Sequence, residues 1–267
     1  TKLKGQELFD TYGQKCNCRY LVNYGFTLEN NQQNNQSMVF LDPVLTMKTQ
    51  TYNTDEMIQE KLNMIGKHRI YKDKYSSFDN RSVLDDVFIF QCSTLHTEET
   101  NTHLFSRASA CFSLLRLLLC TETELVTLKQ SINEQLSNIE HEDRHVRDML
   151  RDQLFCYVQC KPTSVHTELK VLDTMSKLCR TQLNGFGTTL QHDMDLIIQD
   201  TNTRTESNIL RILISEKEVL TWYIYLKEYI FGLWRKHGNV TRISRNLRNG
   251  NKFKVYGEFH WEKIPTK

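Results

Sequence analysis

The segment FSLLRLLLCTETEL, residues 112–125, decides the fold class, because its pattern predicts the end of one helix and the start of the next. Apolar side chains recur with helical spacing through residues 101–120, which predicts a strongly apolar helix. Thr121 and Glu124 then form a capping-box pattern, in which the hydroxyl and the carboxylate bond free backbone amides at a helix start. The apolar helix must therefore end near Cys120.

Helical periodicity dominates on both sides of this segment. Thr54 is a candidate N-cap for a helix that Gly66 ends. Further helices are expected at about residues 141–159, 164–183, 188–200 and 203–236. These segments predict a mainly α fold.

The first 48 residues differ from the rest in composition. Residues 1–26 are rich in aromatic side chains and glycine, which predicts two short strand or turn elements around the Tyr-Gly pairs. Residues 29–37 are nearly all carboxamides and predict a solvated loop that buries nothing. Residues 37–48 predict one more strand, which ends in a turn at Asp42-Pro43.

The bulk composition excludes several protein classes. With 39% hydrophobic and 25% charged residues, the 267-residue chain has enough apolar side chains for one or two globular domains. Its 34 basic and 32 acidic side chains leave a net charge of +2, which argues against a nucleic-acid scaffold. No apolar run reaches the roughly 18 residues that span a bilayer, so membrane insertion is not expected.

The eight cysteines predict reduced thiols rather than disulfides. Several lie inside apolar helical patterns, which is typical of core residues in a cytoplasmic or other reducing intracellular compartment. Cys156 and Cys160 have the i, i+4 spacing that places two thiolates on one helical face. A zinc site needs two further ligands, and His145 and His166 form no ligand pattern, so no metal site is expected.

Three segments together resemble one family, the SET-domain protein methyltransferases that carry a Rubisco-methyltransferase-type substrate-binding lobe. KGQELFDTYGQKCNCRYLVNYGF, residues 4–26, is similar to the closing motif of the SET domain. FSLLRLLLCTETEL is similar to the leucine-rich helix of the lobe, and NILRILISEKEVL, residues 208–220, to its last long helix. The family includes Rubisco large-subunit methyltransferase and the actin-histidine methyltransferases.

The resemblance implies three regions. Residues 1–48 correspond to the end of a SET domain, a short β and turn remnant with a linker. Residues 49–236 correspond to the multi-helix substrate-binding lobe, and residues 237–267 are a basic and aromatic extension that lies outside the family pattern.

The resemblance also implies an activity, the transfer of a methyl group from S-adenosylmethionine to a lysine or histidine nitrogen of a protein bound by the lobe. Tyr12 matches a catalytic tyrosine at the methyl-transfer channel, and Tyr24 matches a second tyrosine of that channel. Phe26 matches an aromatic residue that flanks the cofactor adenine. Asn17 and Arg19 match positions that brace the turn beneath the active site.

Two cofactor motifs of the family, an early glycine-containing strand and an Asn-His segment, do not occur in this chain. Both lie upstream of the Tyr-Gly motif in the family, so the chain is expected to be a piece of a longer enzyme. The alternative is a non-catalytic SET-like interaction subunit of a large assembly.

The last region has the only local excess of charge. Seven basic residues and no acid occur between residues 235 and 254, and aromatic residues are interleaved with them and follow them. Such a strip binds RNA by phosphate contacts and stacking, docks on an acidic protein, or folds back on its own lobe. The candidate partner-binding residues are Arg235, Lys236, Arg242, Arg245, Arg248, Lys252 and Lys254.

Overall fold

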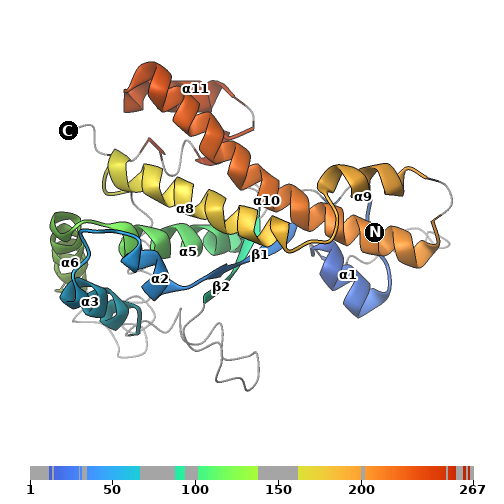
Figure 1. Ribbon diagram of the computed structural model, residues 1–267, viewed down its shortest axis with the longest axis horizontal. Helices are drawn as coiled ribbons and strands as arrows, with labels where there is room; N and C mark the ends of the chain where they lie inside the picture. Colours follow the sequence, from blue (N-terminus) through green and yellow to red (C-terminus); the bar gives the residue numbers. More distant parts are fainter. Residues whose placement is uncertain are drawn as a thin grey trace, which may run out of the picture.

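The fold is mainly α, as the sequence predicts, and is built around three long helices (Figure 1). The computed structural model describes residues 12–13, 15–29, 31, 35–66, 88–93, 102–137, 162–199, 202–250, 252–256, 261–262 and 264. Within these residues α8 (Val165–Asn184) packs against both α5 (Thr102–Leu119) and α10 (Arg204–His237). The expected helix at 141–159 lies outside the described residues.

Polar caps set the ends of these helices. The predicted capping box of α6 (Glu122–Ser137) is confirmed, since the Thr121 amide donates to the Glu124 carboxylate at 2.8 Å and the Glu124 amide donates to the Thr121 hydroxyl at 3.4 Å. A second capping box, formed by Thr203 and Glu206, begins α10. Gly238, with φ +55°, ends α10 in the left-handed conformation that glycine adopts without strain.

A two-stranded antiparallel sheet packs against the three long helices (Figure 1). The predicted strand is confirmed as β1 (Gln36–Leu41), which pairs with β2 (Phe88–Ser93) from Gln36 opposite Ser93 to Leu41 opposite Phe88. Alternate residues Ser37, Val39 and Leu41 are buried. The sheet thus adds one short layer to a helical core.

Two secondary-structure expectations for the first 48 residues are wrong. Residues 17–24 form a helix, α1 (Asn17–Tyr24), because Asn17 and Tyr20 bury one face and Gly25, with φ +77°, supplies its left-handed C-cap. Asp42 does not end the strand in a turn but caps α2 (Pro43–Lys48), whose first position suits proline.

α2 is followed by the predicted helix α3 (Asp55–Gly66), for which Thr54 accepts a bond from the Met57 amide at 3.2 Å. Lys61 of α3 is fully buried, and its ammonium donates to Asn53 Oδ1 and to the backbone oxygens of Leu118 and Cys120. The carbonyls at the end of α5 and directly after it are therefore capped by a side chain of α3.

Several of the described residues after Gly238 belong to the same core as the three long helices. Asn239 caps α11 (Val240–Asn249), and Ile243 and Leu247, one turn apart, are fully buried. The short helix α12 (Lys254–Tyr256) brings Tyr256 into the core beside Phe112, with ring centroids 5.7 Å apart. Trp261 is also fully buried, so the basic region folds back on the lobe.

Candidate functional site

The predicted catalytic and cofactor residues come together around α1. The ring centroids of Tyr12 and Tyr24 lie 4.5 Å apart, and Phe26 lies 5.7 Å from Tyr12 and 6.2 Å from Tyr24. Tyr20, which sequence reasoning did not single out, stacks on Phe26 at 5.3 Å and donates a hydrogen bond to the Gly13 carbonyl. Tyr12, Tyr20, Tyr24 and Phe26 are called the aromatic cluster below.

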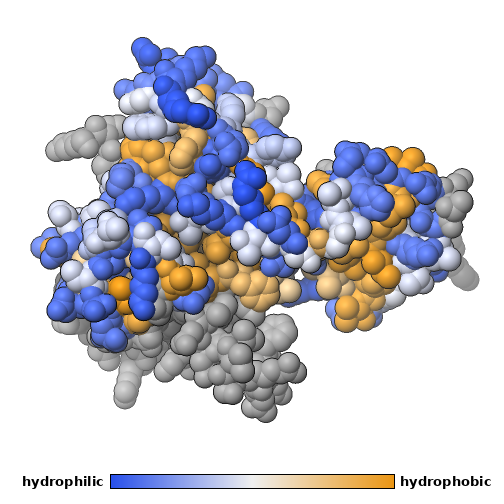
Figure 2. Space-filling view, viewed as in Figure 1, coloured by the Kyte–Doolittle hydropathy of each residue, from blue (hydrophilic) through white to orange (hydrophobic). Residues whose placement is uncertain are grey.

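The aromatic cluster has an inner and an outer part. Tyr20 is 6% exposed and anchors the group, whereas Tyr12 is 56% and Tyr24 41% exposed. Lys15 places its ammonium 5.8 Å from the centroid of the Tyr24 ring. Figure 2 shows apolar residues reaching the surface at this end of the molecule, over α1 and α9 (Leu190–Ile197). The outer rings therefore present accessible aromatic faces.

Asn17 fixes α1 to the rest of the molecule. Its side chain exchanges two 3.0 Å hydrogen bonds with the backbone of Leu28 and donates to the Ser215 hydroxyl of α10 at 3.5 Å. This agrees with the expectation that Asn17 braces the turn. Arg19, expected to brace the same turn, is exposed to solvent.

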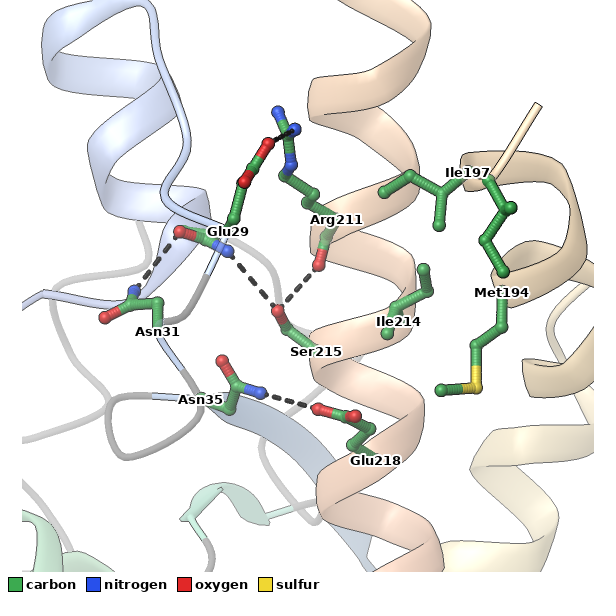
Figure 3. Close-up of a pocket in the computed structure, with 11 residues that line it drawn as sticks. Glu29, Asn31, Asn35, Met194, Ile197, Arg211, Ile214, Ser215 and Glu218 are labelled. Carbon is green, nitrogen blue, oxygen red and sulfur yellow. Dashed lines mark hydrogen bonds and ion pairs between the residues drawn. The ribbon is translucent and has the colours of Figure 1, made fainter. Parts of the chain in front are cut away.

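A cleft of about 410 Å³ lies between α1, the loop after it, α9 and α10 (Figure 3). Asn31 and Asn35 line it and are each 4% exposed, so the expectation that the carboxamide-rich loop buries nothing is wrong. Their amides have partners: Asn31 donates to Asn17, and Asn35 donates to Glu218 at 2.9 Å. Asn31 and Asn35 are buried at little cost because acceptors inside the fold satisfy their amide groups.

Two carboxylates of α10 have perturbed acidity: Glu218, which lines the cleft, and Glu216, which is not among the lining residues. Burial raises the pKa of Glu216. Burial also raises the pKa of Glu218, and the hydrogen bond from Asn35 only partly opposes this. Sequence reasoning missed Glu218, because its partner Asn35 lies 183 residues away along the chain.

The basic candidate residues lie on α10, α11 and α12, except Lys252, which lies in the turn before α12. Arg235, Lys236, Arg242, Arg245, Arg248, Lys252 and Lys254 are all exposed. Arg248 pairs with Glu262 at 2.7 Å, and Lys252 lies over the Tyr225 ring at 4.7 Å. Phe253, Tyr256 and Trp261 are buried, so these three aromatic residues are not available to stack on bases.

Neither a metal site nor a membrane span is found in the described part of the chain. No group of three histidine, cysteine or acidic residues is placed to hold a metal ion there. Cys156 and Cys160 lie outside the described residues. None of the described helices combines the length and the apolar character needed to cross a bilayer.

Comparison with known proteins identifies the helical region. The family model described as Rubisco LSMT substrate-binding matches residues 53–220. No curated protein sequence matches the chain. Among solved structures, Rubisco LSMT bound to sinefungin and monomethyllysine matches with a TM-score of 0.47 at 17% identity, over 84% of this chain and 41% of that one.

A second solved structure, Rubisco LSMT bound to AdoMet, matches with a TM-score of 0.45 at 17% identity, over 80% of this chain and 38% of that one. The chain therefore spans about two fifths of the length of these proteins. The family match contains two of the three segments that carried the resemblance, residues 112–125 and 208–220 but not residues 4–26, and it extends over more than half of the chain. This chain belongs to the Rubisco LSMT substrate-binding family.

Proposed function

We propose that this chain is part of an S-adenosylmethionine-dependent protein N-methyltransferase, in which the aromatic cluster borders the methyl-transfer site and the helical lobe holds the protein substrate. One observation carries the proposal. Tyr12, Tyr24 and Phe26, matched to functional positions of the SET family by sequence alone, lie in one cluster around α1. α1 packs on α10. The first part of α10 lies within the region that matches the Rubisco LSMT substrate-binding family.

The outer rings of the cluster fit the cofactor in charge and shape. S-adenosylmethionine supplies an electrophilic methyl group on a sulfonium cation. An aromatic face attracts a cation within about 6 Å of the ring centroid, and the Tyr24 ring already has the Lys15 ammonium at 5.8 Å. Phe26 is half-buried and stacks on Tyr20, which leaves it fixed in place for contact with a planar adenine.

Tyr12 would act by orienting the acceptor nitrogen. Its ring is held against Tyr24 and Phe26, so its hydroxyl has a restricted set of positions. Methyl transfer needs the nucleophile, the methyl carbon and the sulfur nearly in line, and correct positioning supplies much of the rate of such a reaction. An uncharged phenol hydroxyl donates a hydrogen bond to a lysine or histidine nitrogen, or accepts one from an N–H of that group.

The substitution Tyr12→Phe tests this role in the full-length protein. The ring contacts with Tyr24 and Phe26 remain, so we expect S-adenosylhomocysteine binding to be unchanged while kcat for methyl transfer falls about 100-fold or more. Tyr225→Phe is the matched control, since that tyrosine is exposed on α10 and lies outside the cluster. A Tyr12→Phe protein that keeps the wild-type kcat would remove Tyr12 from the mechanism.

A further inference from the structure

The cleft between α1, α9 and α10 combines an apolar wall with a polar wall (Figure 3). Its apolar wall consists of Met194 and Ile197 from α9, Ile198 directly after it, and Ile214 from α10. Met194 is 37% and Ile198 81% exposed, so this wall is open to solvent. The residues of the aromatic cluster are not among those that line the cleft.

The polar wall contains a buried acceptor that no described residue satisfies. Asn35 is 4% exposed, and its Nδ2 donates to Glu218 Oε2 at 2.9 Å. That bond fixes the orientation of the amide, because only the nitrogen can donate to a carboxylate. Asn35 Oδ1 has no hydrogen-bond partner within the described part of the chain. Figure 3 shows this oxygen on the side of the amide that faces away from Glu218, and the oxygen is itself buried.

The polar wall also carries a negative charge beside Asn35 that is unpaired within the described residues. Arg211, the only basic residue among the described residues that line the cleft, pairs with Glu29 at 2.6 Å. Glu218 receives the Asn35 amide but forms no ion pair with any residue that the structure describes. Burial raises the pKa of Glu218, which indicates a carboxylate that lacks a positive partner.

These features select one class of ligand. An unpaired carboxylate attracts a donor with positive charge and repels an anion. The opposite aliphatic wall suits a chain of methylene groups. A lysine side chain combines both parts, since its stem packs on apolar surface and its ammonium donates three hydrogen bonds. The cleft volume of about 410 Å³ is within the usual range for a ligand site.

We propose that this cleft binds a lysine side chain of a partner protein, with the ammonium held by the Glu218 carboxylate and the aliphatic stem on Met194, Ile198 and Ile214. The site is separate from the aromatic cluster and binds its ligand without methyl transfer. In a methyltransferase it would anchor a basic residue of the substrate away from the residue that is methylated. Its existence does not depend on the proposed activity.

Methyl NMR of the full chain without cofactor tests the proposal, because the apolar wall consists of isoleucine and methionine residues. The probe is lysine blocked at both ends, Nα-acetyl-lysine amide, and its uncharged counterpart is blocked norleucine. We expect the blocked lysine to shift the methyl signals of Met194, Ile198 and Ile214 saturably and to leave buried Ile243 unchanged. We expect blocked norleucine to bind at least about tenfold more weakly, as the loss of charge-assisted bonds predicts.

The substitution Glu218→Gln removes the charge and keeps an acceptor for the Asn35 amide. We expect it to weaken blocked-lysine binding about tenfold. Glu228→Gln, an exposed glutamate of the same helix, is the control and should bind as the wild type does. Ile198→Ser tests the apolar wall and should weaken binding without loss of the fold, because this side chain is 81% exposed.

Three results would overturn the proposal: no saturable shift of the cleft methyl signals, equal affinity for blocked norleucine, or unchanged affinity in a folded Glu218→Gln protein. The methyl spectrum of each variant reports directly whether it is folded. Methyl-transfer activity does not enter these measurements. A failed lysine site and a failed methyltransferase assignment are therefore distinguishable.

Discussion

The hydroxyl of Tyr256 donates a 2.7 Å hydrogen bond to Oε1 of Glu168, a residue 88 positions earlier in the chain. Glu168 also receives two bonds from the Arg116 guanidinium, at 2.7 and 2.8 Å. Arg116 is 2% exposed and the other two residues 1% or less, so this network is inaccessible to water. It joins α5, α8 and α12, and makes the C-terminal region part of the lobe.

We expect Tyr256→Phe to lower the free energy of unfolding by about 1–3 kcal/mol, the usual cost of leaving a buried group short of a hydrogen bond. Ring packing on Phe112 is kept, so the loss reports the hydroxyl alone. Chemical denaturation measures it, with Tyr229→Phe, a 39% exposed tyrosine, as the control. Equal losses in the two variants would contradict a structural role for the Tyr256 bond.

In the C-terminal region, the buried apolar residues should stabilise the fold, whereas the exposed basic residues should contribute little. Arg242 and Arg245 are exposed on α11, so the double substitution to glutamine should change stability by no more than about 0.5 kcal/mol. Ending the chain after Gly238 removes the buried Leu247, Tyr256 and Trp261 and should prevent cooperative unfolding of the lobe. Thermal unfolding distinguishes the two variants, and a stable truncated lobe would contradict this account.

Glu124 should make stability depend on pH. Burial alone would raise its pKa, but hydrogen bonds from Ser164, Thr121 and Thr167 outweigh burial and lower the pKa below its ordinary value. A carboxyl with a lowered pKa in the folded state stabilises the fold above its unfolded pKa. The contribution is lost as the pH falls through the folded pKa.

We therefore expect Glu124→Gln to lower the free energy of unfolding by about 1–2 kcal/mol at neutral pH. The difference from wild type should shrink as the pH falls below the usual glutamate range. Denaturation curves at neutral and acidic pH measure it, with exposed Glu122→Gln as the control. A difference that stays constant with pH would show that Glu124 acts through packing and not through charge.

The Lys61 ammonium should stabilise the end of α5. Lys61→Met keeps most of the buried aliphatic volume but leaves the Leu118 and Cys120 carbonyls without this donor. We expect the free energy of unfolding to fall by about 2–3 kcal/mol, because these buried carbonyls lose a hydrogen-bond donor. Lys129→Met, which breaks a surface pair with Glu60, should cost no more than about 1 kcal/mol. Denaturation of both variants checks the prediction, and similar costs would contradict it.

Local signals in the sequence predict most of the helices, because each depends on residues close together in the chain. Thr121 and Glu124 show both the end of α5 and the start of α6. α1 was missed because its aromatic residues and glycine favour strands and turns, while its helical face has only two buried residues. α11 was missed because its basic residues dominate the pattern, although Ile243 and Leu247 have helical spacing.

The two candidate sites also differ in how close together in the sequence their residues lie. Tyr12, Tyr24 and Phe26 are within 15 positions of one another, and a family motif was enough to select them. The cleft depends on pairs such as Asn17 with Ser215 and Asn35 with Glu218, which are more than 180 positions apart. A pair of this kind has no local pattern, and a carboxamide-rich loop is ordinarily solvated. The burial of Asn31 and Asn35 follows only from the packing of α1 and β1 on α10.

Calorimetry of the full-length protein with S-adenosylhomocysteine tests most directly whether the aromatic cluster belongs to a methyl-donor site. We predict saturable heat in the wild type and weaker binding in Phe26→Ala, because the residue fixed by stacking on Tyr20 is removed. Tyr225→Phe should bind as the wild type does. Absence of heat and of any thermal stabilisation in the folded wild-type protein would contradict the assignment of this chain to a methyltransferase.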